Sequence, residues 1–193
     1  MISLNERAHR RVEALLARAE ECKVAAHPIE HGGRFVDCGI EVRGGLVAGL
    51  ELARVCLADL AEVAIVPVEV GSRSCPALQV TTDHPVAACL GSQYAGWAIS
   101  EGKFFAMGSG PIRAAYGHEP LFEELGLAER PDAVVGVVEG RKPPTPAVVA
   151  RIAEACRVAP SAVTCWGHPR RAWPAGRRWS PGRSRRPCTS STS

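Results

Sequence analysis

The last third of the sequence carries the pattern that most constrains the fold. It opens with a nearly uninterrupted apolar run, AVVGVVEG at 133–140, and a short run of this kind predicts a strand covered on both faces. A helix follows over residues 145–160, where Thr145 is a typical N-cap and Pro146 suits the first helical position. Residues 161–164 then begin another strand. Strands and helices therefore alternate, which predicts the α+β class (mixed α and β).

The rest of the sequence continues this alternation. Ser3 or Asn5 can cap a first helix, whose apolar face includes Val12 and Leu15. A later helix has an apolar stripe that begins at Leu46. The predicted strands are 23–30, 34–42, 62–70, 77–85 and 97–100, and the further helices are 45–60, 86–96 and 122–132.

The charge of the chain is divided unevenly along its length. Residues 164–193 hold seven of the 23 Lys and Arg and none of the 20 Asp and Glu, which leaves residues 1–163 mildly acidic. A nucleic-acid-binding domain needs a clustered basic face, and residues 1–163 show none. We therefore expect no nucleic-acid partner.

The lengths of the apolar runs and the character of the N-terminus indicate the cell compartment. None approaches the roughly 18 residues of a membrane span, and the charged N-terminus does not resemble a signal peptide. We expect a cytoplasmic protein with no membrane partner. Its eight cysteines are then reduced thiols, and without a C-x-x-C pair they predict neither a zinc site nor any other metal site.

The sharpest local feature is the stretch GKFFAMGSGPIRAAYG. Residues 108–110 predict a flexible turn whose backbone N–H groups can converge on an anion or an oxygen-rich ligand. Pro111 starts the next helix, and Lys103 and Arg113 flank the turn. The alternative is a Gly-rich connection with two surface bases. The spacing fits neither common nucleotide-binding motif, so no nucleotide is implied.

Three further places could carry chemistry. Asp83 can orient His84 or cap the helix that follows. The thiol of Cys38, beside Asp37, could be a nucleophile, although sequence gives no reason for a low pKa. His27 lies four residues from another histidine but not on a helix, so we expect no metal there.

Several long stretches resemble one enzyme family. They are VDCGIEVRGGLVAGLELARVCLADLA, PALQVTTDHP, AGWAIS and KFFAMGSGPIRA, and the resemblance runs from residue 1 to about residue 164 without large gaps. In these stretches the chain resembles the methenyltetrahydromethanopterin cyclohydrolases. The long string FFAMGSGP makes the resemblance specific.

The resemblance implies an activity. These enzymes hydrolyse the cationic methenyl bridge of a methanopterin-type carrier to the N5-formyl form, in formaldehyde oxidation or methanogenesis. It also implies a two-subdomain fold around a deep pocket, a homotrimer, a small pterin substrate, and no metal or redox cofactor. The alternative is a non-catalytic carrier-binding remnant, or an inactive fragment with a basic tail.

The resemblance and the motifs together nominate site residues. We expect Lys103 to be catalytic, since a cation there suits the polar pterin and the acidic tail of the carrier. The candidate substrate-binding residues are Asp83, His84, Met107, Gly108, Ser109, Gly110, Pro111 and Arg113.

The last thirty residues read unlike the rest, with three of the four tryptophans. In a shifted reading frame with GC-rich codons, they encode a strand, a turn and a helix with Arg-x-x-Glu, the pair that the resemblance makes central to catalysis. We therefore expect a frameshifted, truncated chain of low activity. It would comprise a folded part, 1–163, incomplete at its C-terminal end, and an unpacked tail, 164–193, with Trp166, Trp173 and Trp179 outside any core. A basic nucleic-acid arm and an unrelated disordered extension are the alternatives.

Overall fold

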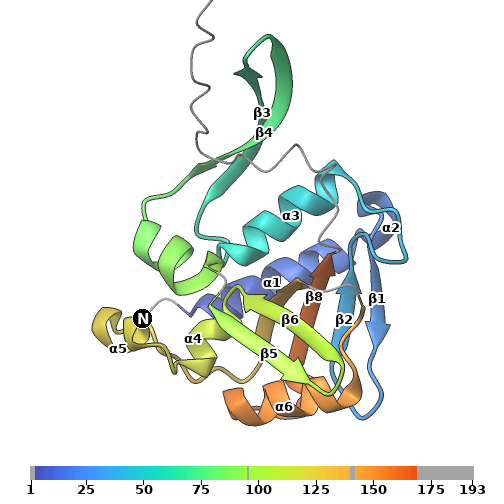
Figure 1. Ribbon diagram of the computed structural model, residues 1–193, viewed down its shortest axis with the longest axis vertical. Helices are drawn as coiled ribbons and strands as arrows, with labels where there is room; N and C mark the ends of the chain where they lie inside the picture. Colours follow the sequence, from blue (N-terminus) through green and yellow to red (C-terminus); the bar gives the residue numbers. More distant parts are fainter. Residues whose placement is uncertain (1–2, 95, 140–141, 169–193) are drawn as a thin grey trace, which may run out of the picture.

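The protein forms a six-stranded mixed sheet and a separate two-stranded arm (Figure 1). The computed structural model describes residues 3–94, 96–139 and 142–168. The strand order is β1-β2-β8-β7-β6-β5; β2, β8 and β7 run parallel, and the other neighbours are antiparallel. The strands of this sheet are β1 (Ala25–Pro28), β2 (Arg34–Asp37), β5 (Trp97–Glu101), β6 (Phe104–Ser109), β7 (Val134–Glu139) and β8 (Val163–His168). This architecture confirms the predicted α+β class.

Helices cover both faces of the central strands. Side chains alternate along a strand, so Val134 and Val138 of β7 pack in the cluster with α6, while Val135 and Val137 pack in the cluster with α1 and α3. This explains the uninterrupted apolar run of β7, which has no solvent-facing side. The helices are α1 (Leu4–Leu16), α2 (Ala19–Cys22), α3 (Leu46–Cys56), α4 (Ile112–Tyr116), α5 (Pro120–Leu125) and α6 (Pro146–Cys156), with a π-helix at Val86–Gln93 and a 3-10 turn at Pro160–Ala162.

Two helix starts follow the cap residues. The Ser3 side chain accepts a hydrogen bond from the N–H of Glu6, and the Thr145 side chain accepts one from the N–H of Val148. Each satisfies an N–H that has no partner within its helix. These predictions are confirmed, with Ser3 rather than Asn5 as the first cap.

The predicted apolar stripe of α3 is wrong at its first member. Leu46 is 68 % exposed, and the buried residues of this helix are Ala48, Glu51 and Val55. This face packs against α1, where Ala48 and Val55 share an apolar cluster with Val12 and the carboxylate of Glu51 forms a two-point ion pair with Arg11, with N–O distances of 2.7 and 2.8 Å. An ion pair between two helices leaves no trace in an apolar periodicity.

The strand that begins at residue 163 continues through His168. Within it Trp166 is fully buried beside Val135 and Val137, and its indole N–H donates to the Cys38 sulfur at 2.9 Å. The predicted boundary between 163 and 164 is therefore wrong, since it cuts a central strand. Trp173 and Trp179 lie outside the described residues.

The arm consists of β3 (Glu62–Val70) and β4 (Arg73–Thr81), paired antiparallel over their full length. It leaves the body between α3 and the π-helix and projects away from the sheet (Figure 1). Both strands were predicted, although β4 begins four residues earlier than expected. Across the described ranges, no helix combines the length and apolar character needed to cross a membrane.

Candidate functional site

The carboxyl ends of the three parallel strands meet at one edge of the sheet. Ligands of open α/β sheets generally bind at this edge, because loops and side chains converge there. β2 ends in Asp37 and β7 ends in Glu139. If the predicted site residues form one site, they are expected to meet at this edge.

Asp37 has a structural role, because its carboxylate orders the loop that follows β2. Its carboxylate is fully buried and accepts four backbone hydrogen bonds, from the N–H groups of Gly39, Ile40, Glu41 and Val42, at 2.7–3.1 Å. Burial acts most strongly and favours the neutral acid, but the four donors together outweigh it and lower the pKa of Asp37. The residue therefore remains ionised and holds the loop after β2.

A possible metal set lies beside Asp37. Side-chain ligand atoms of His27, Asp37 and Glu41 lie within 4.8 Å of one another, and His27 Nε2 is buried without a partner among the described residues. A carboxylate offers about four lone-pair sites, and all four of Asp37 accept backbone N–H groups. The group therefore fits an ion poorly.

Cys38 does not have the surroundings of a nucleophile. Its thiol donates to the carbonyl of Gly167 at 3.1 Å and accepts from the indole of Trp166. Burial raises the pKa of Cys38 to about 11. The thiol is therefore protonated at neutral pH and ties β2 to β8.

The predicted flexible turn at residues 108–110 is wrong. Gly108 and Ser109 belong to β6, where Gly108 lies opposite both Trp97 and Val138. Gly110 has a φ of +84°, and its N–H donates to the carbonyl of Ser92 at 2.8 Å. The pairing of β6 on both sides thus takes up the segment expected to form a free amide cradle.

The two residues after this segment have structural partners. Pro111 precedes α4, and its carbonyl accepts from the side chain of Asn5 at 2.8 Å. Arg113 is fully buried and donates twice to Glu119, at 2.9 and 2.5 Å, and once to the carbonyl of Leu90 at 2.9 Å. Through these three hydrogen bonds Arg113 joins α4 to α5 and to the π-helix. Its side chain therefore does not face solvent.

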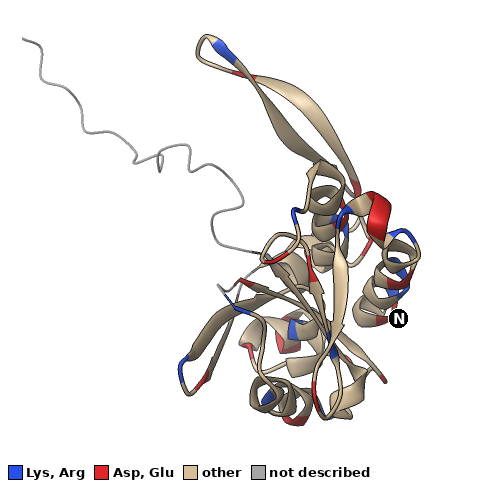
Figure 2. Ribbon diagram, turned by 90° about the vertical axis from the view of Figure 1, so that its right-hand side faces the viewer, with Lys and Arg blue, Asp and Glu red and all other residues tan. Residues whose placement is uncertain are grey.

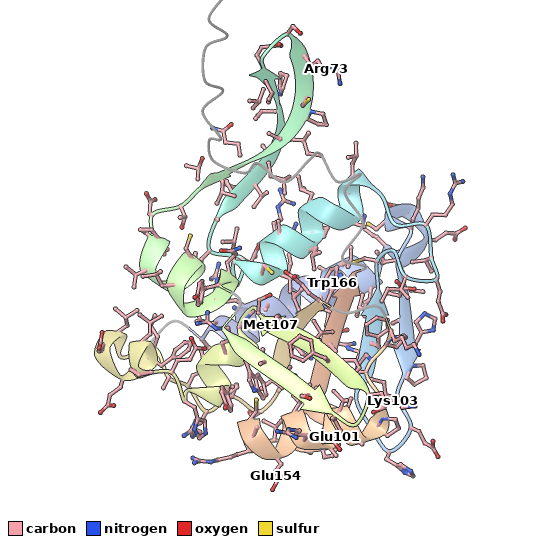
Figure 3. All side chains as sticks on the ribbon, in the orientation of Figure 1. Arg73, Glu101, Lys103, Met107, Glu154 and Trp166 are labelled. Atoms are coloured by element: carbon pink, nitrogen blue, oxygen red, sulfur yellow. The ribbon has the colours of Figure 1, made fainter. Side chains whose placement is uncertain are left out.

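Lys103 lies apart from these residues. It sits in the exposed turn between β5 and β6, at the end of the hairpin opposite Gly108, and Figure 3 shows it apart from Met107. Among the described residues it has no ion-pair partner. Its charge is therefore available to a ligand that reaches the hairpin tip.

Asp83 and His84 lie in a third place, at the base of the arm. They line an open cleft of about 570 Å³, together with Arg7, Arg11 and Arg54. The Thr82 hydroxyl, not Asp83, accepts the N–H of His84, at 3.0 Å. Within the described residues, Asp83 neither caps the π-helix nor bonds to His84.

The sequence interpretation missed Glu139. This half-buried carboxylate ends β7 directly opposite Met107, on the face that carries Val137. On the same face α1 and α3 cover β7, β8 and the end of β6 at Ser109, but they leave the first part of β6 open, where Phe105 is 57 % exposed. The sequence signal that could have identified Glu139 is its position as a charged residue at the end of a buried apolar strand.

Ser109 and Cys56 close the inner end of this open face. Their side-chain oxygen and sulfur lie 3.9 Å apart, and burial raises the pKa of Cys56 to about 11. The open face therefore has neutral groups at the Ser109 end of β6, the apolar side chains of Met107 and Phe105 along β6, and the carboxylate of Glu139 beside them. This combination suits a flat, partly apolar cation.

Comparison with known proteins gives one consistent answer. A family model described as Cyclohydrolase (MCH) matches residues 3–176. The chain is 44 % identical over 165 residues to the methenyltetrahydromethanopterin cyclohydrolase of Methanococcoides burtonii, and 46 % identical over 165 residues to that of Methanosarcina mazei; each alignment covers 84 % of this chain and 51 % of the relative. The enzyme of the same name from Xanthobacter autotrophicus is 44 % identical over 153 residues, which cover 79 % of this chain and 45 % of the relative.

The chain spans about half the length of the curated relatives it matches. The family match covers most of the chain and runs to residue 176, past about residue 164, where the sequence resemblance was expected to stop. By these similarities the chain belongs to the methenyltetrahydromethanopterin cyclohydrolase family.

Proposed function

We propose that the protein binds 5,10-methenyltetrahydromethanopterin and takes part in its hydrolysis to the N5-formyl form. Family membership over residues 3–176 is the observation that carries this proposal. The reaction needs no redox step, and we propose that it proceeds without a cofactor or metal, in the cytoplasm. A carrier-binding chain without turnover is the second candidate, because the chain spans only about half of its relatives.

The open face of β6 and β7 is the proposed substrate site. The methenyl bridge carries a positive charge, so Glu139 attracts it electrostatically, while the pterin ring stacks over Met107 and Phe105. The electrophilic carbon of the bridge is then held at the carboxyl edge of the parallel strands, where a base can activate water. Lys103, at the tip of the neighbouring hairpin, remains the proposed contact to the carrier's acidic tail.

The first experiment separates binding from turnover. The full chain is titrated with the methenyl carrier, and binding is followed by quenching of tryptophan fluorescence while hydrolysis is followed by loss of the carrier's absorbance. Binding with turnover supports the enzyme, and binding without turnover supports the second candidate. A chain that does neither contradicts the proposed function.

A second experiment tests the site. Glu139→Gln should weaken carrier binding about tenfold, or about 1.4 kcal/mol, because it removes the charge opposite the cation. Glu154→Gln is the matched control, since this exposed carboxylate lies on α6, away from the open face (Figure 3). Equal affinities of the two variants would place the substrate elsewhere.

Lys103 has its own test. Lys103→Ala should weaken binding or turnover of the carrier at least tenfold, with a larger loss at low salt, because the contact is exposed and electrostatic. The control is Lys142→Ala, a change of the same kind at another exposed lysine. An unchanged affinity and rate would return Lys103 to the ordinary surface.

A further inference from the structure

The β3–β4 arm has two free edges. It is a separate two-stranded sheet, so neither strand has a neighbouring strand on its outer side. An edge of this kind presents backbone N–H and C=O groups, to which a strand of another molecule can add. A protein with such edges therefore needs a feature that prevents the addition.

The composition of the arm favours strand addition. Its exposed apolar side chains, each at least 40 % exposed, are Ile65, Val68, Val70, Leu78 and Val80. Short segments with high β-propensity and little charge stack readily into long ladders of identical strands. Apart from one proline each, β3 and β4 have this composition.

Charge does not protect the length of the arm. Across residues 62–81 the charged side chains are Glu62 at the base and Glu69 and Arg73 near the tip, and Figure 2 shows the length between them uncharged. Charged side chains on an edge are a common means of repelling a second strand. The middle of the arm does not have this protection.

A pair of prolines occupies the uncharged middle. Pro67 of β3 lies directly opposite Pro76 of β4, and both residues are exposed. Proline has no backbone N–H, so within a sheet it is confined to positions whose N–H would not join the ladder. Two prolines face to face are compatible with the pairing only if both nitrogens point outward, to the two free edges.

The register of the arm gives the same orientation. A two-residue loop that begins with Gly71 joins the strands, and this glycine has a φ of +64° at the position where type II′ turns have glycine. Such a loop is closed by a hydrogen-bonded pair, here Val70 and Arg73, and non-hydrogen-bonded and hydrogen-bonded pairs alternate from there. Pro67 and Pro76 form the fourth pair, a non-hydrogen-bonded one, so their nitrogens point away from the partner strand.

The two prolines therefore interrupt both outer edges at the same level. On β3 the neighbouring outward N–H groups are those of Ile65 and Glu69, and on β4 they are those of Ser74 and Leu78. A strand added to either edge would find no donor between these groups. The proline ring would also fill the space in which the backbone of the added strand must lie.

We propose that Pro67 and Pro76 close both edges of the arm to strand addition, which leaves the arm open to contact only on its faces. The two prolines thereby restrict the kind of partner. An extended segment cannot lengthen this sheet, and copies of the chain cannot join edge to edge into a ladder. This proposal does not depend on the carrier or on turnover.

The test restores the missing donors with Pro67→Val and Pro76→Val in the full chain, followed by thioflavin T fluorescence and electron microscopy. The double variant should form fibres, with thioflavin T fluorescence about tenfold above that of the wild type, because each arm then offers two complete edges. The wild type should form no fibres under the same conditions. A fibre-forming wild type, or a double variant without fibres, would overturn the proposal.

The single variants separate the edges from a general loss of solubility. Each single change opens one edge, so two copies can pair there, but the opposite edges stay closed and growth stops. We expect no fibres from Pro67→Val alone or from Pro76→Val alone. If either single variant forms fibres as fast as the double variant, the prolines do not act by closing edges and the proposal fails.

A matched control adds the same residue type without opening an edge. Ala64→Val with Ala77→Val places one extra valine in each strand, in hydrogen-bonded pairs whose N–H groups already point to the partner strand. This variant should form no fibres. Fibres equal to those of the proline double variant would trace the effect to apolar surface and contradict the proposal.

Hydrogen exchange shows which part of the chain joins the fibres. In fibres of the proline double variant, amide exchange should be slowed within residues 62–81 relative to the wild type in solution. Protection that is gained only in the strands of the six-stranded sheet would mean that the body has aggregated, and the role assigned to the two prolines would be wrong.

Discussion

Replacing Trp166 tests whether the end of the described chain is part of the fold. The side chain is fully buried among β2, β7 and α1, and its N–H donates to Cys38. A buried aromatic side chain removes about 200 Å² from water, worth about 5 kcal/mol at 25 cal/mol per Å² as an upper bound. We therefore expect Trp166→Ala to lower the free energy of unfolding by about 4 kcal/mol, within the 3–5 kcal/mol usual for such changes.

Two further variants separate the parts of this effect. Trp166→Phe keeps most of the packing and loses the hydrogen bond, so it should cost about 1–2 kcal/mol; Cys38 keeps its bond to Gly167. Phe105→Ala removes an aromatic ring that is 57 % exposed and should change stability by less than about 0.5 kcal/mol.

The assay is urea unfolding followed by far-ultraviolet circular dichroism, because tryptophan fluorescence changes with the substitution itself. The slope of free energy against urea should stay constant across the series, which shows that stability alone has changed. If Trp166→Ala costs no more than Phe105→Ala, residues 164–168 do not belong to the sheet, and the folded part does end at residue 163.

Three other outcomes follow from two buried charged groups and from the different exposure of two cysteine thiols. Asp37→Asn should destabilise the protein by about 2–4 kcal/mol at pH 7, and since the folded pKa of Asp37 is lowered, the wild-type advantage should fade in urea melts as the pH falls from about 4 through that lowered pKa. Glu119→Gln leaves Arg113 buried without its counter-charge and should lower stability by about 3–5 kcal/mol in the same melts, while a loss below 1 kcal/mol would mean that the pair is solvated. In a thiol-reagent time course Cys75 should react at once and Cys38 only on unfolding; early labelling of Cys38 would contradict its burial and raised pKa.

Local chemistry made some elements predictable. The strand β7 and the helix α6 have signals within their own residues: an apolar run for the first, and Thr145 with Pro146 for the second. β8 was predicted only at its start, because the letters after Thr164 do not look like a strand, whereas tertiary packing accepts Trp166 there.

The site was less predictable, because it depends on pairing between distant strands. The Gly-rich segment at 108–110 has the composition of a flexible turn, but pairing with β5 and β7 makes most of it strand. The predicted residues therefore fall in separate places: Lys103 at a hairpin tip, His84 at the arm base and Arg113 in the interior. Glu139 reaches the proposed site through its register with β6, which no single stretch of sequence reveals.

The central position of β8 has a consequence for how the chain is made. β8 pairs with β2 on one side and with β7 on the other. The edges of β2 and β7 that face β8 therefore lack a hydrogen-bonding partner until residues 163–168 have been synthesised. About 125 residues separate the end of β2 from β8, and ribosomes need about 6–25 s to add them at 5–20 residues per second. During this interval the nascent chain presents an open strand edge at Phe35 and Val36, and we expect its yield in cells to depend on chaperones that shield that edge.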